Sequence, residues 1–161
     1  GLLTFQLLCG GVDGGNAEKG KRIFLEKIEA SCARCHQAGD LTEGILEGAG
    51  VGPNLSHIGS QHDRSYLLEA LLLPNKTIAP GYENLLISMR DGKVYAGLLK
   101  SETTDTLELT SPEDGPLTLK KTDIESREPG LSAMPAHLRY VLSKDELRDL
   151  VEFLANLKHT P

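Results

Sequence analysis

The chain has 161 residues, of which 25% are charged and 4% are aromatic, and its formal net charge is −6 at pH 7. This length suits one compact domain with a real hydrophobic core and is short for two. The acidic balance argues against nucleic acid and against anionic membrane surfaces as partners. Because the chain has no tryptophan and few aromatic residues, a large flat apolar ligand would supply core volume that its side chains lack.

Residues 1–15 are predicted to be a flexible N-terminal linker or remnant, because they end in a glycine-rich run. Residues 1–8 are too short to span a bilayer and have no basic segment, and the chain does not begin with Met. We therefore expect an excised or processed piece with no membrane span and no signal sequence of its own. Cys9 follows a bulky leucine where a lipoprotein signal has a small residue, so an incidental thiol is favoured over lipidation.

A first helix is predicted to start after Asn16, which can cap it, with Glu18 in the first turn. Gly20 and Phe24 lie on one face of this helix. Glycine costs stability inside a helix, so its presence at position 20 indicates that another helix crosses closely there.

The next segment, Cys32-Ala33-Arg34-Cys35-His36, matches the Cys-x-x-Cys-His pattern by which haem is attached to c-type cytochromes. The two thiols are spaced to form thioethers with the two vinyl groups of one porphyrin. The adjacent imidazole then lies below the iron as its first ligand. Five consecutive residues therefore specify a cofactor, its attachment and one iron ligand.

Two other kinds of site remain open for this motif. A dithiol redox site would follow a buried strand, whereas residues 24–31 look helical. A structural zinc site needs a second ligand pair at finger-like spacing, and the remaining candidates are scattered along the chain. These candidates are Cys9, His57, His62, His137 and His159.

Residues 38–52 are predicted to form a loop, since they are rich in glycine and acid and show no periodicity. Asp40, Glu43 and Glu47 could hold a metal, but calcium loops have a stricter ligand pattern, so a solvated loop is favoured. Pro53 follows this loop. Proline has no amide hydrogen, and its free carbonyl oxygen is the kind of acceptor that an axial histidine needs for its second ring nitrogen.

The chain resembles class I cytochromes c over about residues 17–158. The motifs that carry the resemblance are residues 32–36, Gly52-Pro53-Asn54-Leu55 and Leu131-Ser132-Ala133-Met134-Pro135. It implies a mainly α fold, the class I helical fold around one covalently attached haem c. It also implies that Pro53 accepts a hydrogen bond from His36, and that the first helix crosses the last at Gly20 and Phe24.

Two further helices are predicted. The first covers residues 63–73 and is stopped by Pro74, and the second closes the chain after a capping box of Ser143 and Glu146. The closing helix should be the one that crosses at Gly20. The predicted apolar faces are Leu68, Leu71 and Leu72 in the first, and Leu147, Leu150, Val151, Leu154 and Leu157 in the second.

Two histidines just before residue 63, His57 and His62, are candidate iron ligands. Polar and glycine neighbours favour a surface position or a contact with a haem propionate instead. Gln61 and Arg64 share this propionate hypothesis.

From residue 82 to about 127 the apolar pattern changes from helical to alternating. Asp91-Gly92 between two apolar runs predicts a hairpin, and residues 111–116 hold a second turn. We expect a small antiparallel insert of about four strands, serving as a cap over the haem edge, a docking surface or a second small module. The alternating runs are Val94, Ala96 and Leu98, then Leu107 and Leu109, then Leu117 and Leu119.

The insert accounts for a long separation between two candidate ligands. His36 and Met134 lie 98 positions apart, and removing the 46 residues of 82–127 leaves 52, close to the layout of a compact cytochrome. This arrangement looks most like a haem-binding domain at the end of large secreted bacterial proteins, often behind a dehydrogenase-like propeller. That resemblance implies export, to the periplasm or elsewhere, and a redox partner protein or a fused dehydrogenase domain.

Only Met89 and Met134 can supply a thioether ligand. Met89 lies in a predicted strand and fits core filling better. Met134 lies in an irregular segment that Pro135 holds extended. We therefore predict His36 and Met134 as the iron ligands, with His137 or an open position as alternatives to Met134.

The predicted function is single-electron transfer through one haem c, in a single domain of residues 16–161. The chain is predicted to be a carrier and not an enzyme, although it could be part of a larger oxidoreductase. Two alternatives remain: a haem enzyme or gas sensor with an open or labile distal site, and a non-haem interaction module that binds zinc. The predicted cofactor-binding residues are Cys32, Cys35, His36, Pro53 and Met134.

Overall fold

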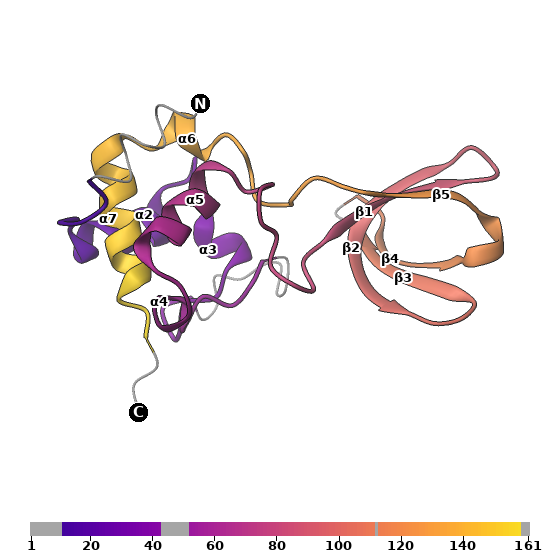
Figure 1. Cartoon of the computed structure of the whole chain (residues 1–161), viewed down its shortest axis with the longest axis horizontal. Helices are drawn as coiled ribbons and strands as arrows, with labels where there is room; N and C mark the ends of the chain where they lie inside the picture. Colours follow the sequence, from indigo (N-terminus) through magenta and orange to yellow (C-terminus); the bar gives the residue numbers. More distant parts are fainter. Residues whose placement is uncertain (1–10, 43–51, 112, 159–161) are drawn as a thin grey trace. The chain divides into compact units, whose positions relative to one another are not determined.

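The computed structural model describes residues 11–42, 52–111 and 113–158, and the chain divides into two compact units (Figure 1). The helical unit comprises Gly1–Thr77 and Met134–Pro161, and the sheet unit comprises Ile78–Ala133. Each unit has its own cluster of buried apolar side chains. The single domain of residues 16–161 that the sequence suggests therefore stays a prediction.

Six helices are described in the helical unit, and the two longest are amphipathic. The first of these begins after Asn16, whose side chain accepts a hydrogen bond from the Lys19 amide, as predicted. The last begins with the predicted capping box, in which the side chains of Ser143 and Glu146 each accept from the other residue's amide. The helices are α2 (Ala17–Glu26), α3 (Cys32–Cys35), α4 (Ile58–Gln61), α5 (Arg64–Leu72), α6 (Leu138–Val141) and α7 (Lys144–Ala155).

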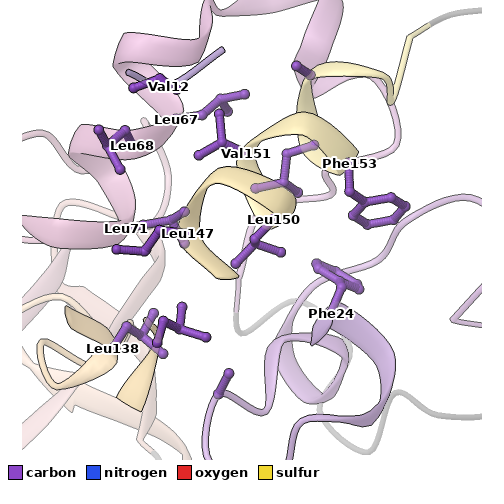
Figure 2. Packing of buried hydrophobic residues seen from close by; sticks show 14 of the residues in the cluster. Val12, Phe24, Leu67, Leu68, Leu71, Leu138, Leu147, Leu150, Val151 and Phe153 are labelled. Carbon is purple, nitrogen blue, oxygen red and sulfur yellow. The ribbon is translucent and has the colours of Figure 1, made fainter. Parts of the chain in front are cut away.

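Helices α2 and α7 cross at Gly20, as the sequence predicted. A Cβ at this position would overlap the backbone carbonyl of Asp149 in α7, so only glycine lets the two backbones approach this closely. One turn later, the rings of Phe24 and Phe153 meet at 5.4 Å between centroids and 53° between planes. Figure 2 shows both rings at the side of α7 that faces α2.

The core of the helical unit lies between α7 and its neighbours (Figure 2). Asp63 caps α5 by accepting from the Tyr66 amide. The buried side chains of α5 are Leu67, Leu68 and Leu71, whereas Leu72, predicted to be on this face, is half-buried.

The part of the predicted linker that the structure describes, residues 11–15, lies against α7. Val12 is 6% exposed and belongs to the core cluster of the helical unit. The amide of Asn16 donates to the Asp149 carboxylate at 2.7 Å, and the Arg148 side chain donates to the Gly11 carbonyl. Cys9 lies outside the described residues.

The sheet unit contains an antiparallel sheet with the strand order β4-β3-β2-β1-β5. The predicted hairpin at Asp91-Gly92 joins β1 to β2, with Gly92 in the left-handed region at φ 88°. Met89 is 8% exposed in the apolar cluster of this unit, which agrees with core filling. The strands are β1 (Asn84–Met89), β2 (Val94–Glu102), β3 (Thr106–Ser111), β4 (Gly115–Lys120) and β5 (Ile124–Pro129), with a short 3₁₀ helix at Lys121–Asp123.

The prediction of a mainly α, class I fold is wrong. The sheet has five strands where about four were predicted, and it forms a compact unit with its own buried cluster. Apolar alternation revealed β2, β3 and β4, and the hairpin signal added β1, but neither revealed β5, which carries Ile124 as its one half-buried residue and is otherwise exposed. Its backbone pairing with β1 makes it a strand, and backbone pairing has no side-chain signature.

In β2, the residues predicted to share one apolar face do not share the same burial. Val94 and Ala96 are exposed and Leu98 is buried, although all three belong to one alternating set. The cluster of the sheet unit is instead joined by Tyr95 and Leu99 from the same strand. Tyr95 pairs with Ile87 of the buried cluster and Val94 pairs with Ser88, so the face of β2 that points into the cluster is the one that carries Tyr95, opposite to the predicted set.

Candidate functional site

The first four residues of the Cys-x-x-Cys-His motif, Cys32–Cys35, form one turn of helix, α3, in the helical unit. Ser31 precedes it in the left-handed conformation at φ 50°, and its hydroxyl donates to the Ile28 carbonyl. A single helical turn places Cys32 and Cys35, three positions apart, on the same side. Both are free, half-buried thiols, so each sulfur is available for a bond to a ligand.

The environment of Cys32 favours its protonated thiol. The pKa of Cys32 is raised from 9.0 to about 11, chiefly by burial; a backbone hydrogen bond lowers it in part, and the neighbouring Cys35 makes the smallest contribution, which raises it. A buried thiol with a raised pKa is a poor spontaneous nucleophile at neutral pH. This argues against the dithiol redox alternative, which needs a reactive thiolate.

His36 follows α3 and is oriented by the chain 17 residues further on. Its Nδ1 lies 2.8 Å from the carbonyl oxygen of Pro53. Since a carbonyl can only accept, Nδ1 carries the proton and Nε2 is the ring nitrogen left for a metal. Burial lowers the pKa of His36, partly offset by the bond to Pro53, so the ring is neutral at physiological pH.

Gly52 makes room for the imidazole. A Cβ on Gly52 would lie 2.6 Å from Cε1 of His36 and 2.8 Å from Nδ1. Both distances are below van der Waals contact, so a side chain here would push the ring away from Pro53. The sequence pattern identified Pro53 but not the role of Gly52, for which the glycine directly before this proline was the available signal.

The segment around Pro53 is joined to the segment around His36 by further hydrogen bonds, which we call the ladder. The Gly52 amide donates to the Cys35 carbonyl at 3.1 Å, and the Leu55 amide donates to the Gln37 carbonyl at 2.8 Å. The Gly39 amide donates to Ser56 Oγ at 2.7 Å. Sequence reasoning missed Gln37, Gly39 and Ser56, because short polar residues in a loop show no periodicity.

Met134 is the first residue of the C-terminal part of the helical unit. It is half-buried and packs against the same apolar cluster as Cys32 does. Met89, by contrast, is buried in the sheet unit. The structure thus brings Cys32, Cys35, His36, Pro53 and Met134 into one compact unit, while their roles as cofactor residues stay predictions.

The other described histidines, His57, His62 and His137, have partners or positions of their own. His62 stacks on Tyr66 with 3.6 Å between ring centroids and 9° between planes. Nε2 of His137 lies 3.3 Å from the carbonyl oxygen of Glu29, and His57 is exposed at the start of α4. Arg64 donates two hydrogen bonds of 3.0 Å to Glu152, which weakens its propionate hypothesis.

Metal sites other than haem iron find no support in the part of the chain that the structure describes. There, no three side chains of His, Cys, Asp or Glu gather into a group that could hold a metal ion. Cys32 and Cys35 are therefore not part of such a group among the described residues, and the candidates Cys9 and His159 lie outside them. Of the acidic loop residues considered for a metal, Asp40 is exposed, whereas Glu43 and Glu47 lie outside the described residues.

The residues of the motif fit a covalently bound haem. Two free thiols lie one helical turn apart, a neutral imidazole is held by its Nδ1, and glycine stands where a Cβ would strike the ring. A model of the cytochrome c family matches residues 17–108, which include all of these features. The chain belongs to the cytochrome c family. A comparison with curated proteins finds no match.

Membership of this family carries haem binding and haem-based electron transfer in general terms. It fits an electron carrier, either alone or within a larger enzyme. Cytochrome c domains are typically exported. Among the described residues of this cytochrome, no helix has both the length and the apolar character needed to cross a bilayer.

Proposed function

We propose that this cytochrome transfers single electrons through one haem c, attached to Cys32 and Cys35 and ligated by His36 and Met134. The observation that carries the proposal is the 2.8 Å hydrogen bond from His36 Nδ1 to the Pro53 carbonyl. A metal-ligating histidine needs such an acceptor, which fixes both its tautomer and its orientation. Here the bond engages Nδ1 of His36 with the Pro53 carbonyl, which leaves Nε2, on the other side of the ring, for the iron.

The two thiols attach the cofactor without any net oxidation. Each S–H would add across one vinyl double bond, so that sulfur would bond to one vinyl carbon and the hydrogen would go to the other. Cys32 and Cys35 would hold the haem through these two thioethers, and His36, the next residue, would supply an imidazole ligand to its iron.

The remaining contributions of the chain are ligation and rigidity. His36 would supply Nε2 and Met134 its thioether as iron ligands, and a thioether ligand would favour the ferrous state and raise the reduction potential. When bound, the haem supplies the one-electron ferric–ferrous couple. No side chain acts as an acid, base or nucleophile during electron transfer.

The test is the spectrum of the holoprotein, matured in a host that attaches haem c. Acid–acetone extraction should leave haem with the wild-type protein, and Cys35→Ala should retain at most one thioether in the haemochrome spectrum. A colourless wild-type protein would overturn the proposal. Met134→Ala should keep covalent haem, lose the low-spin His/Met spectrum and bind carbon monoxide, and an unchanged ferric spectrum would assign the second ligand elsewhere.

Carbon monoxide binding by the wild-type ferrous protein separates a carrier from a haem enzyme or gas sensor. A firmly bound thioether resists displacement, so we expect no binding in the wild type. We further propose that the cytochrome works in the bacterial periplasm or another exported location, with a redox partner protein or a fused dehydrogenase domain as its partner.

A further inference from the structure

Ser56 lies at the end of the ladder and connects its two sides through one hydroxyl group. Its Oγ accepts a hydrogen bond from the Gly39 amide at 2.7 Å and donates one to Asn54 Oδ1 at 2.6 Å. The hydroxyl therefore uses both its acceptor and its donor capacity. One side of this connection follows His36 in the chain, and the other follows Pro53.

Asn54 extends the connection to the other segment. Its Oδ1 also accepts from the Ser56 amide at 2.9 Å, and its Nδ2 donates to Gln37 Oε1 at 3.1 Å. Ser56 and Asn54 thus form a closed set of side-chain bonds around the backbone bond from Leu55 to Gln37. This set holds residues 53–56 at a fixed distance from residues 36–39.

The distance between these segments decides how strong the His36–Pro53 bond is. The acceptor is a backbone carbonyl, so it can move relative to the ring only if its segment moves. Without the Ser56 hydroxyl, the Gly39 amide and Asn54 Oδ1 each lose a partner, and the two backbone bonds of the ladder remain. The carbonyl of Pro53 would then be held less tightly against Nδ1.

We propose that Ser56 is a positioning residue that tunes the reduction potential of the cytochrome through the bond between His36 and Pro53. The inference rests on the proposed function, since it takes His36 as an iron ligand. Donation from Nδ1 to a carbonyl raises the basicity of the other ring nitrogen. A more basic ligand favours the ferric state, so a weaker bond to Pro53 shifts the equilibrium toward the ferrous state.

The matched pair Ser56→Thr and Ser56→Val tests this in the holoprotein, because the two side chains share a shape and differ in the hydroxyl. Ser56→Thr should keep the wild-type potential. Ser56→Val should shift the one-electron equilibrium about threefold toward ferrous, or about 28 mV at 59 mV per tenfold change. The hyperfine-shifted proton resonances of the His36 ring should move in the valine variant and not in the threonine variant.

Ser101→Ala is the control, since it removes a hydroxyl bond of 2.6 Å, to Glu108, within the sheet unit. It should leave the potential unchanged. Equal potentials and equal His36 resonances in the Thr and Val variants would overturn the role of Ser56. That result differs from failure of the proposed function, in which the wild-type protein itself carries no covalent haem. If Ser56→Val does not mature, Ser56→Ala replaces it in the same comparison.

Discussion

At the scale of single residues, Gly52 matters to the site because of an atom that it lacks. Gly52 is not among the described glycines with positive φ, so alanine meets no backbone penalty there. The penalty is steric, because its Cβ would lie 2.6 Å from Cε1 of His36. We predict that Gly52→Ala destabilises the folded protein by about 1–3 kcal/mol, the usual cost of overpacking. Denaturant unfolding of the holoprotein measures this change.

Pro53→Ala is the matched control for that variant. It keeps the accepting carbonyl, removes the restriction that proline places on φ and adds a backbone N–H, and it puts no atom against the His36 ring from position 52. It should therefore unfold closer to the wild type than Gly52→Ala does. If both variants lose the same stability, the crowding between position 52 and the His36 ring is not the cause.

The sequence predicted the residues of the attachment motif and Pro53, but not the hydrogen bonds that hold the two segments together. Residues 32–36 are contiguous, so their spacing in the sequence also sets their spacing in the structure. Pro53 was identified because proline leaves its carbonyl free to accept a hydrogen bond. Ser56 and Gln37 act through hydrogen bonds between segments 17 or more positions apart. Such bonds depend on how the loop folds back, and the residue types that make them are common in any loop.

At the scale of elements, the start of α7 combines a cap with an ion pair. Glu146 accepts from the Ser143 amide at 2.8 Å, and Lys27 of the segment after α2 donates to Glu146 at 2.7 Å. The bond from Lys27 and then that from the Ser143 backbone lower the pKa of Glu146 below 4.5. Together these contacts tie the beginning of the last helix to the end of the first.

This lowered pKa predicts a pH dependence of stability. A carboxyl with a lower pKa when folded stabilises the protein above its unfolded pKa, here 4.5, and loses that contribution as the pH falls through the folded value. We predict that Glu146→Gln costs about 0.2–1 kcal/mol at pH 7, as for an exposed ion pair. Its free energy of unfolding should fall less steeply than that of the wild type as the pH drops below 4.5.

Urea unfolding from about pH 3 to about pH 7 measures both effects, because carboxyl groups titrate within this range. Glu26→Gln, at the exposed end of α2, is the control and should follow the wild-type profile. Parallel profiles for Glu146→Gln and the wild type would show that the carboxylate of Glu146 adds no stability to the link between α2 and α7.

Elements with a periodic apolar face were predicted well, and elements without one were not. The helices α2, α5 and α7 and the hairpin at Asp91-Gly92 appear where their patterns placed them. Strand β5 lacks alternation because it is an edge strand with exposed side chains, and it ends at Pro129, which has no amide hydrogen to donate. The predicted fold class was wrong because the segment expected to be a small insert is a five-stranded sheet with its own buried cluster.

At the scale of the whole molecule, two separate clusters of buried side chains stabilise the two units. All predicted haem residues belong to the helical unit, and none belongs to Ile78–Ala133. A bound group stabilises the unit whose folded state it binds. The stability of the sheet unit should therefore depend on its own core and not on haem.

We predict that the double variant Cys32→Ser with Cys35→Ser, which cannot attach haem, loses protection against amide hydrogen exchange in α7 while β1 and β3 keep theirs. Exchange measured by mass spectrometry on peptides from both units tests this.

The reciprocal variant is Ile87→Ala, since Ile87 is 0% exposed in the sheet core and its truncation costs about 2–5 kcal/mol. It should reduce protection in the sheet and leave α7 and the haem spectrum unchanged. Loss of protection in both units from either variant would mean that residues 16–161 fold as one cooperative domain.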